Sequence, residues 1–225
     1  MPANAQGAVA SPSSPFRAAD CANLPFKPRL SLRLLGATHR GAHPALKATL
    51  RMPGGGANIA STQVALPHSE FVENAHFKTI CTRVQFAASQ CPQGSIYGEA
   101  EARTPLLEAP LRGPVYLRSS SHVLPDLVMA LKGPPSLPIE IDLAGHVDSV
   151  NGGLRTTFET VPDAPVTEFT LRMQGAKKGL IVNSTNLCAS VNRATAKFTA
   201  QNGKAITTHP LMQASCKGHA KHKRG

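Results

Sequence analysis

The residues of this chain alternate between apolar and polar with a period of two in many short segments, and this pattern restricts the fold most. Between residues 139 and 147, Ile139, Ile141, Leu143 and Val147 fall on one side, opposite mainly charged residues. Successive side chains of a β-strand point to opposite faces, so the alternation predicts strands with one buried face. By the same reasoning we expect strands at 29–34, 46–52, 62–66, 95–103, 115–118, 127–131, 154–161, 166–173, 194–201 and 204–214. On these strands the core is predicted to include Ile139, Ile141, Leu143, Phe169 and Leu171.

Turn-forming residues separate these segments. The chain has 19 prolines and 18 glycines, and Asn151-Gly152-Gly153 and Asn202-Gly203 are strong signals for hairpin turns. About a dozen short strands joined by such turns are typical of a β-sandwich. We therefore predict an all-β, antiparallel β-sandwich over residues 21–216. The proline-rich stretch 104–114 is the candidate boundary between two packed β subdomains.

One segment departs from the alternation. Ile80, Val84, Ala87 and Ala88 recur at the spacing of one helical face. Pro92 follows and would stop a helix. We therefore expect one short helix around Cys81 and Cys91.

The charge of the chain is strongly positive. Its 225 residues carry a formal net charge of +11, of which Lys217, Lys221, Lys223 and Arg224 supply part from the C-terminal end. Residues 1–20 are predicted to be a disordered arm and residues 217–225 a basic disordered tail. Such a surface favours weak, salt-sensitive attraction to anionic polymers and predicts no specific nucleic acid partner. No segment approaches the ~20 apolar residues of a membrane-spanning helix.

Five cysteines in a chain of this kind predict disulfides and an oxidising compartment. Cys81 and Cys91 stand ten positions apart around the expected helix, a spacing that favours a disulfide over the closer pairs typical of zinc sites. Residues 1–20 do not have the pattern of a signal peptide. Two interpretations follow: the chain is a truncated piece of an exported protein, which we favour, or it is cytosolic with reduced cysteines.

A second disulfide is predicted between Cys188 and Cys216. Both lie just outside the Asn202-Gly203 hairpin, and a two-residue turn would place Cys216 opposite Ala189, one position from Cys188. Cys21 is then left over. It is free, pairs with another chain, or displaces one of the assigned partners.

Few residues have the pattern of a catalytic or metal site. Ser119–Ser121, His122 and Asp126 are the residue types of a hydrolytic triad, but nothing in the sequence places them on a nucleophile elbow. Gly36, Gly41 and Pro44 surround His39 and His43, so their helical ligand spacing loses its meaning. Weaker candidates are His219 and His222 for a loosely held metal, Asp142, Asp148 and Asp163 for calcium, and Asn183-Ser184-Thr185 for glycosylation. We therefore predict no catalytic residue, no metal site and no cofactor.

Several sequence blocks resemble a family of uncharacterised, cysteine-containing, β-rich domains in large exported bacterial proteins. These blocks include Leu24-Pro-Phe-Lys-Pro-Arg-Leu, Cys91-Pro-Gln-Gly-Ser, Gly113-Pro-Val-Tyr-Leu-Arg-Ser, Asp148-Ser-Val-Asn-Gly-Gly, Val161-Pro-Asp-Ala-Pro-Val and Asn186-Leu-Cys. The resemblance covers roughly residues 21–216. It implies export, disulfides and a cell-surface or cell-wall context, and it implies no particular activity.

Three functions are compatible with this pattern. The first is a non-catalytic, structural or adhesive domain that is secreted or held at the cell surface, where other surface proteins are its partners. The second is a polymer- or carbohydrate-binding domain for anionic cell-wall material, which a row of Arg and Tyr on one sheet face would favour. The third and weakest is a hydrolase built around His122 and Asp126.

Overall fold

The computed structural model describes residues 19–150 and 153–216. Nearly all of the predicted N-terminal arm, and the predicted basic tail, lie outside these ranges. The strands are β1 (Arg29–Leu35), β2 (Ala45–Arg51), β3 (Ile59–Ala65), β4 (Glu70–Val72), β5 (Ile96–Arg103), β6 (Leu111–Arg118), β7 (Asp126–Lys132), β8 (Glu140–Val150), β9 (Gly153–Phe158), β10 (Glu168–Met173), β11 (Ile181–Asn183), β12 (Thr195–Ala200), β13 (Ala205–Thr208) and β14 (Met212–Ala214). The helix α1 spans Arg83–Ala87, and short 3-10 turns lie at Cys21–Asn23, Asn74–His76, Gln93–Ser95 and Ala176–Lys178.

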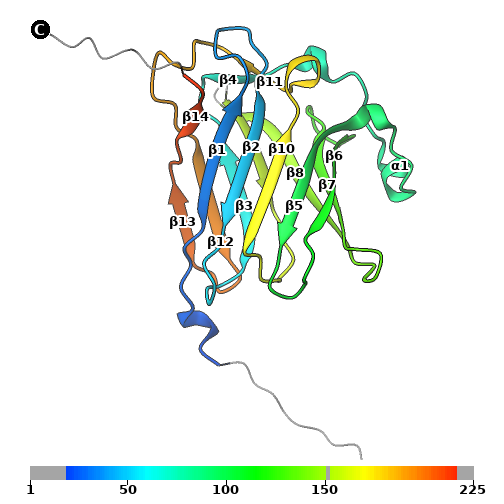
Figure 1. Cartoon of the computed structure of the whole chain (residues 1–225), viewed down its shortest axis with the longest axis vertical. Helices are drawn as coiled ribbons and strands as arrows, with labels where there is room; N and C mark the ends of the chain where they lie inside the picture. The colour runs from blue at the N-terminus through cyan, green and yellow to red at the C-terminus, as the bar shows by residue number, and fades with distance from the viewer. Residues whose placement is uncertain (1–18, 151–152, 217–225) are drawn as a thin grey trace, which may run out of the picture.

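Twelve of these strands form one sheet, in the order β13-β12-β3-β9-β8-β7-β6-β5-β10-β2-β1-β14. Strand β8 has 11 residues and pairs with β7 through its first half and with β9 through its second. The sheet curls back on itself there, so that β1, β2 and β10 lie in front of β3 and β12 (Figure 1). The all-β prediction is confirmed, and a single curled sheet supplies both layers.

Two small features complete the sheet system. β4 and β11 pair antiparallel as a separate two-stranded sheet. β14 pairs with β1 in parallel, whereas every other strand pair in the described residues is antiparallel. Neither β4 nor β11 was expected, because three-residue strands are too short to show alternation.

The hairpin at Asn202-Gly203 forms, but in another register from the one predicted. Thr199 lies opposite Ala205, and Ala200 N–H donates to the Lys204 carbonyl at 2.8 Å. Gly203 has a φ of 81°, the left-handed conformation typical of a three-residue hairpin loop. The predicted strand 204–214 is also divided, because Pro210 lies between β13 and β14 and has no N–H for a ladder.

The stretch 104–114 lies inside a hairpin. Its first part connects β5 to β6, and these two strands pair antiparallel, with Ala102 opposite Leu111. Both strands belong to the large sheet. The sheet therefore continues across the proline-rich stretch without interruption.

The short helix predicted around Cys81 and Cys91 is present as α1. The residue that it packs against the sheet is not one of the apolar residues from which the helix was predicted. Thr82 caps it, with its Oγ1 accepting from Gln85 N–H and the Gln85 side chain accepting from Thr82 N–H. Val84 is 80% exposed. Phe86 makes the packing contact instead, edge-on against Tyr116 of β6 at a ring distance of 6.0 Å.

The core is mainly aliphatic and lies under β5, β6 and β7. Its fully buried residues include Tyr97, Val115, Leu117, Met129 and Leu131. A second cluster joins the two layers, because Phe198 of β12 packs with Leu30 and Leu50 of β1 and β2. In the part of the chain that the structure describes, no helix is both long and apolar enough to cross a membrane.

The five residues predicted to face the core do face inward and pack against it, but they are only half-buried. They are Ile139, Ile141, Leu143, Phe169 and Leu171. Their inward direction follows from the alternation, as predicted. Their partial exposure has another cause, which is a cavity between the two layers of the sheet.

Candidate functional site

An apolar cavity of about 410 Å³ opens between the two layers. Three segments surround one end of it, residues 53–58, 104–107 and 161–167. Its walls come from the inner faces of β5, β7, β8 and β10, where Ile141, Leu143, Met129 and Phe169 contribute side chains. Cavities that bind small molecules are commonly about 300–1,000 Å³ and mostly apolar.

A second apolar cavity of about 160 Å³ continues the first toward β4 and β11. The two cavities share Leu50, Thr62, Phe158 and Phe169 as lining residues. The far part is lined by Leu66, Val72 and Ile181 among others. The interior space is therefore elongated along the layers.

Polar groups are few along this space. Thr62 lines both parts, and its buried Oγ1 has no hydrogen-bond partner among the described residues. A ligand rich in hydroxyl or charged groups would lose its bonds to water here and gain almost none in return. The lining therefore suits an apolar ligand.

The structure also brings together His122 and Asp126, two of the residue types considered for a hydrolase. His122 lies in the loop between β6 and β7, and its Nε2 is 2.9 Å from Asp126 Oδ1. His146 of β8 joins them, with its Nδ1 at 2.8 Å from the same Nε2. Leu127 lies opposite Gly145, so the residue before Leu127 and the residue after Gly145, Asp126 and His146, lie side by side on the outer face.

Among the described residues, no serine hydroxyl is hydrogen-bonded to the ring of His122. Ser120 Oγ lies 2.7 Å from the Leu124 carbonyl and 3.0 Å from the His122 carbonyl. Its hydroxyl therefore stabilises the backbone of the loop. No hydrogen bond joins Ser119 or Ser121 to the His122 ring in the described structure.

Neighbouring ion pairs fix the orientation of this cluster. Arg118 Nη2 donates to Asp126 Oδ2 at 3.0 Å, which leaves Oδ1 directed at the histidines. Asp148 forms a two-point ion pair with Arg155, and this bonding lowers the pKa of the Asp148 carboxyl. Asp148 Oδ2 lies 4.0 Å from His146 Nε2.

Among the described residues, the other histidines and aspartates considered from the sequence do not gather into a metal site. His39 Nδ1 contacts the Arg40 carbonyl, whereas His43 Nε2 contacts Glu73 Oε2 at 3.2 Å. Asp163 accepts from Asn58 Nδ2 at 2.8 Å, away from the Asp148–Arg155 pair. His219 and His222 lie outside the described residues. His146 was not identified as a site residue from the sequence, because no sequence spacing relates it to His122. The pairing of β7 with β8 brings the two residues together.

The candidate glycosylation acceptor, Asn183, is not accessible in the folded chain. Asn183 is 1% exposed. Its Nδ2 donates to the carbonyls of Ala37 and His39, each at 3.2 Å. The side chain serves to fix the loop between β1 and β2.

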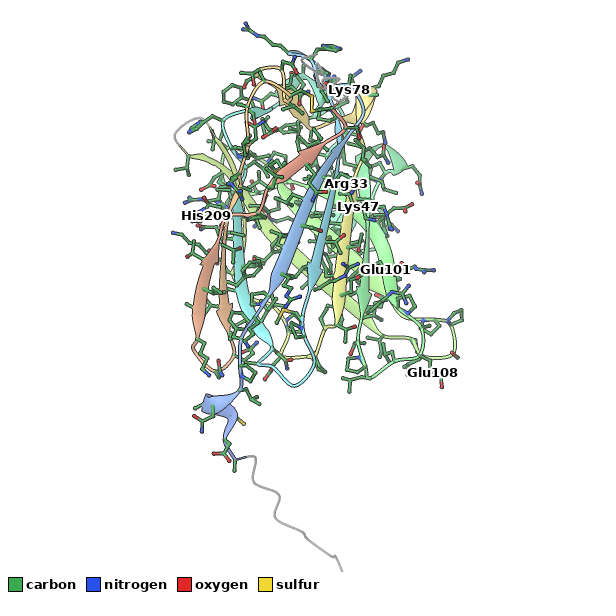
Figure 2. The ribbon with its side chains drawn as sticks, turned by 60° about the vertical axis from the view of Figure 1, so that its left-hand side comes forward. Arg33, Lys47, Lys78, Glu101, Glu108 and His209 are labelled. Carbon is green, nitrogen blue, oxygen red and sulfur yellow. A yellow bond between two sulfur atoms is a disulfide. The ribbon has the colours of Figure 1, made fainter. Side chains whose placement is uncertain are left out.

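A row of cations crosses the outer face of three strands. Arg33 lies opposite Lys47 and Lys47 opposite Arg172, and Figure 2 shows Arg33 and Lys47 side by side on β1 and β2. None of the three forms an ion pair with a described residue, whereas Arg51, on the same face, pairs with Glu168 at 2.7 Å. Like charges directly opposite one another are destabilising. Glu99 of β5 lies opposite Arg172, whereas Arg33 and Lys47 have no carboxylate opposite them, so an anion bound beside these two would relieve their repulsion.

Both predicted disulfides are present. Cys81 and Cys91 are joined with a Cα–Cα distance of 5.2 Å, and Cys188 and Cys216 with 5.6 Å. Cys21 is free and exposed. The predicted hairpin register does not account for the disulfide between Cys188 and Cys216. The chain leaves the hairpin at Pro210, and β14, which precedes Cys216, pairs with β1.

No protein-family model matches the chain, and no curated protein matches it. Among solved structures, the chain is similar to a DUF4466 family protein from Parabacteroides merdae, with 10% sequence identity and a TM-score of 0.32. The similarity covers 81% of this chain and 44% of that chain, so this chain spans less than half the length of that protein. A TM-score of this size supports no conclusion about function.

Proposed function

We propose that this chain is an exported, non-catalytic domain that binds an apolar ligand between the two layers of its sheet. The observation that carries the proposal is the set of inward-facing side chains that remain half-buried around the cavity of about 410 Å³. Apolar surface left accessible in the interior forfeits roughly 25 cal/mol per Å² of stabilisation, which a bound apolar molecule would recover. The two disulfides support the exported setting.

The shape of the space favours a linear alkyl chain, such as that of a fatty acid. The two cavities join through Leu50, Thr62, Phe158 and Phe169, so a chain that enters beside residues 53–58 could extend toward β4. The polar head of such an amphiphile would stay at the opening. Ring-shaped sugars and nucleotides fit this lining poorly, because it offers few hydrogen-bonding groups.

The test is the binding of a fluorescent fatty acid, cis-parinaric acid, to the full chain. We expect saturable binding with one molecule per chain. Leu50→Trp would fill the junction between the cavities and should weaken binding by about ten-fold or more. Val123→Trp is the matched control, because Val123 is 98% exposed and lies in the loop before β7. Absence of saturable binding, or equal binding by Leu50→Trp, would contradict the proposal.

A second candidate function is binding of an anionic cell-wall polymer on the outer face. The row of Arg33, Lys47 and Arg172 supports it. The tyrosines that would strengthen it are elsewhere: Tyr97 is 1% exposed and Tyr116 packs against Phe86. A structural or adhesive role at the cell surface is compatible with either ligand.

This second candidate is tested by charge reversal. Replacing the three row residues with Glu should abolish retention on an immobilised polyanion at moderate salt. Replacing the exposed cations Arg40, Lys78 and Lys197 with Glu changes the net charge equally and is the control. Equal loss in both variants would assign the attraction to net charge alone, and no row-specific site would remain.

A further inference from the structure

Three atoms that carry lone pairs converge outside β7 and β8. His122 Nε2 lies 2.9 Å from Asp126 Oδ1 and 2.8 Å from His146 Nδ1. All three atoms lie within 4.8 Å of one another. The cluster is on the outer face of the sheet and is separate from the apolar cavity.

A single two-centre hydrogen bond cannot satisfy both contacts of His122 Nε2. A neutral imidazole nitrogen is either a donor or an acceptor, yet His122 Nε2 faces two partners at once. If it carries the proton, it must divide that proton between the Asp126 carboxylate and the His146 nitrogen. If it does not, its lone pair points at a carboxylate oxygen. A cation between the three atoms would accept all three lone pairs.

We propose that His122, Asp126 and His146 bind a divalent transition-metal ion, with Zn²⁺ as the expected occupant. Two imidazole nitrogens and one carboxylate oxygen are a common zinc ligand set. The hard ions Mg²⁺ and Ca²⁺ prefer sites made of oxygen atoms. The side chains of His122 and His146 are 28% and 39% exposed, so solvent can reach the site and supply a further ligand.

Neighbouring contacts hold the three side chains in place, and the rings of His122 and His146 lie with their centroids 3.8 Å apart. Arg118 holds Asp126 through Oδ2 at 3.0 Å, which presents Oδ1 to the ion. Ser120 fixes the loop that carries His122 through the Leu124 carbonyl at 2.7 Å. The pairing of Leu127 with Gly145 sets the position of His146 beside Asp126. Such outer contacts commonly alter metal affinity by roughly 10–100-fold when they are removed.

The test is calorimetric titration of the metal-free full chain with ZnCl₂. All proteins carry His219→Ala and His222→Ala, so that the histidines near the C-terminus add no binding. We expect one Zn²⁺ per chain, with no comparable heat from MgCl₂. His146→Ala and, separately, Asp126→Asn should each weaken binding by at least about ten-fold.

His39→Ala is the matched control, because it removes an exposed imidazole elsewhere on the surface. Melting temperatures measured in EDTA show whether each variant is folded, and His146→Ala is the variant expected to fold best because its side chain is the most exposed of the three. Zinc binding that is unchanged in both cluster variants overturns the proposal, as does a parent chain that binds no zinc. The apolar cavity shares no residue with this site, so fatty acid binding is unaffected by either result.

Discussion

Glu70 of β4 is the buried carboxyl group with the strongest effect expected on stability. It is 0% exposed, Ser69 Oγ donates to its Oε2 at 2.7 Å, and its Oε1 has no partner among the described residues. Burial raises the pKa of Glu70 to about 7, although the Ser69 hydrogen bond opposes this. Asn183 lies directly opposite, and its buried Oδ1 also has no hydrogen-bond partner in the described structure. Glu70 Oε1 and Asn183 Oδ1 are both acceptors, so a protonated Glu70 would supply an O–H donor where one is lacking.

The raised pKa of Glu70 makes the folded chain less stable as the pH rises. The folded pKa lies above the ordinary value of 4.5, so the unfolded chain ionises first as the pH rises. The free energy of unfolding should therefore fall between about pH 4.5 and pH 7, by roughly 3 kcal/mol from this group. Glu70→Gln should remove that fall and stabilise the chain at pH 8, as measured by urea denaturation across this range. Glu108→Gln, at an exposed position, is the control, and a Glu70→Gln profile parallel to the parent's would show that Glu70 is ionised in the folded chain.

At the scale of elements, the segment from Cys81 to Cys91 illustrates how a short helix is held in place. Five residues of helix are too few to be stable in isolation. The Thr82–Gln85 capping box supports the first turn, Phe86 packs on Tyr116, and Cys81 N–H donates to the Leu117 carbonyl at 2.8 Å. The disulfide then closes the loop around the helix.

Removing this disulfide should lower stability substantially. A closed loop of this length contributes about 2.5–3 kcal/mol in the chain-entropy model, so Cys81→Ala combined with Cys91→Ala should lose about that much in denaturant titrations. Cys21→Ala should have no effect, because Cys21 is free and exposed. Alkylation of the denatured but unreduced protein should add a single label, at Cys21; a label on Cys81 would contradict the assignment.

At the scale of the whole molecule, the interior has a closed part and an open part. Val115 is 0% exposed within the cluster under β5 to β7, whereas Ile141 lines the cavity. The difference follows from the curl of the sheet, which brings the layers into contact through Phe198, Leu30 and Leu50 but leaves space beside β8 and β10.

Carboxylates introduced into these two parts should therefore have different effects. Val115→Asp buries a charge without a partner and should unfold the domain. Ile141→Asp places the carboxylate beside the cavity that opens near residues 53–58, so it should destabilise the domain less than Val115→Asp does while abolishing fatty acid binding. Circular dichroism with urea titration measures both. If Ile141→Asp unfolds as completely as Val115→Asp, the cavity is closed in solution.

Local features of this protein could be predicted from its amino-acid sequence. Alternation depends on adjacent residues, so it located most strands and their inward faces, including that of Ile141. The capped helix and the pairing of Cys81 with Cys91 were also predictable, because the residues involved are close along the chain. Features that depend on how far the sheet curls could not be predicted in this way. The cavity exists because two inner faces do not fully meet. The site at His122 exists because β8 brings His146 beside Asp126. These outcomes depend on contacts between distant segments, and the residues on either side of such a contact carry no local pattern that reveals it.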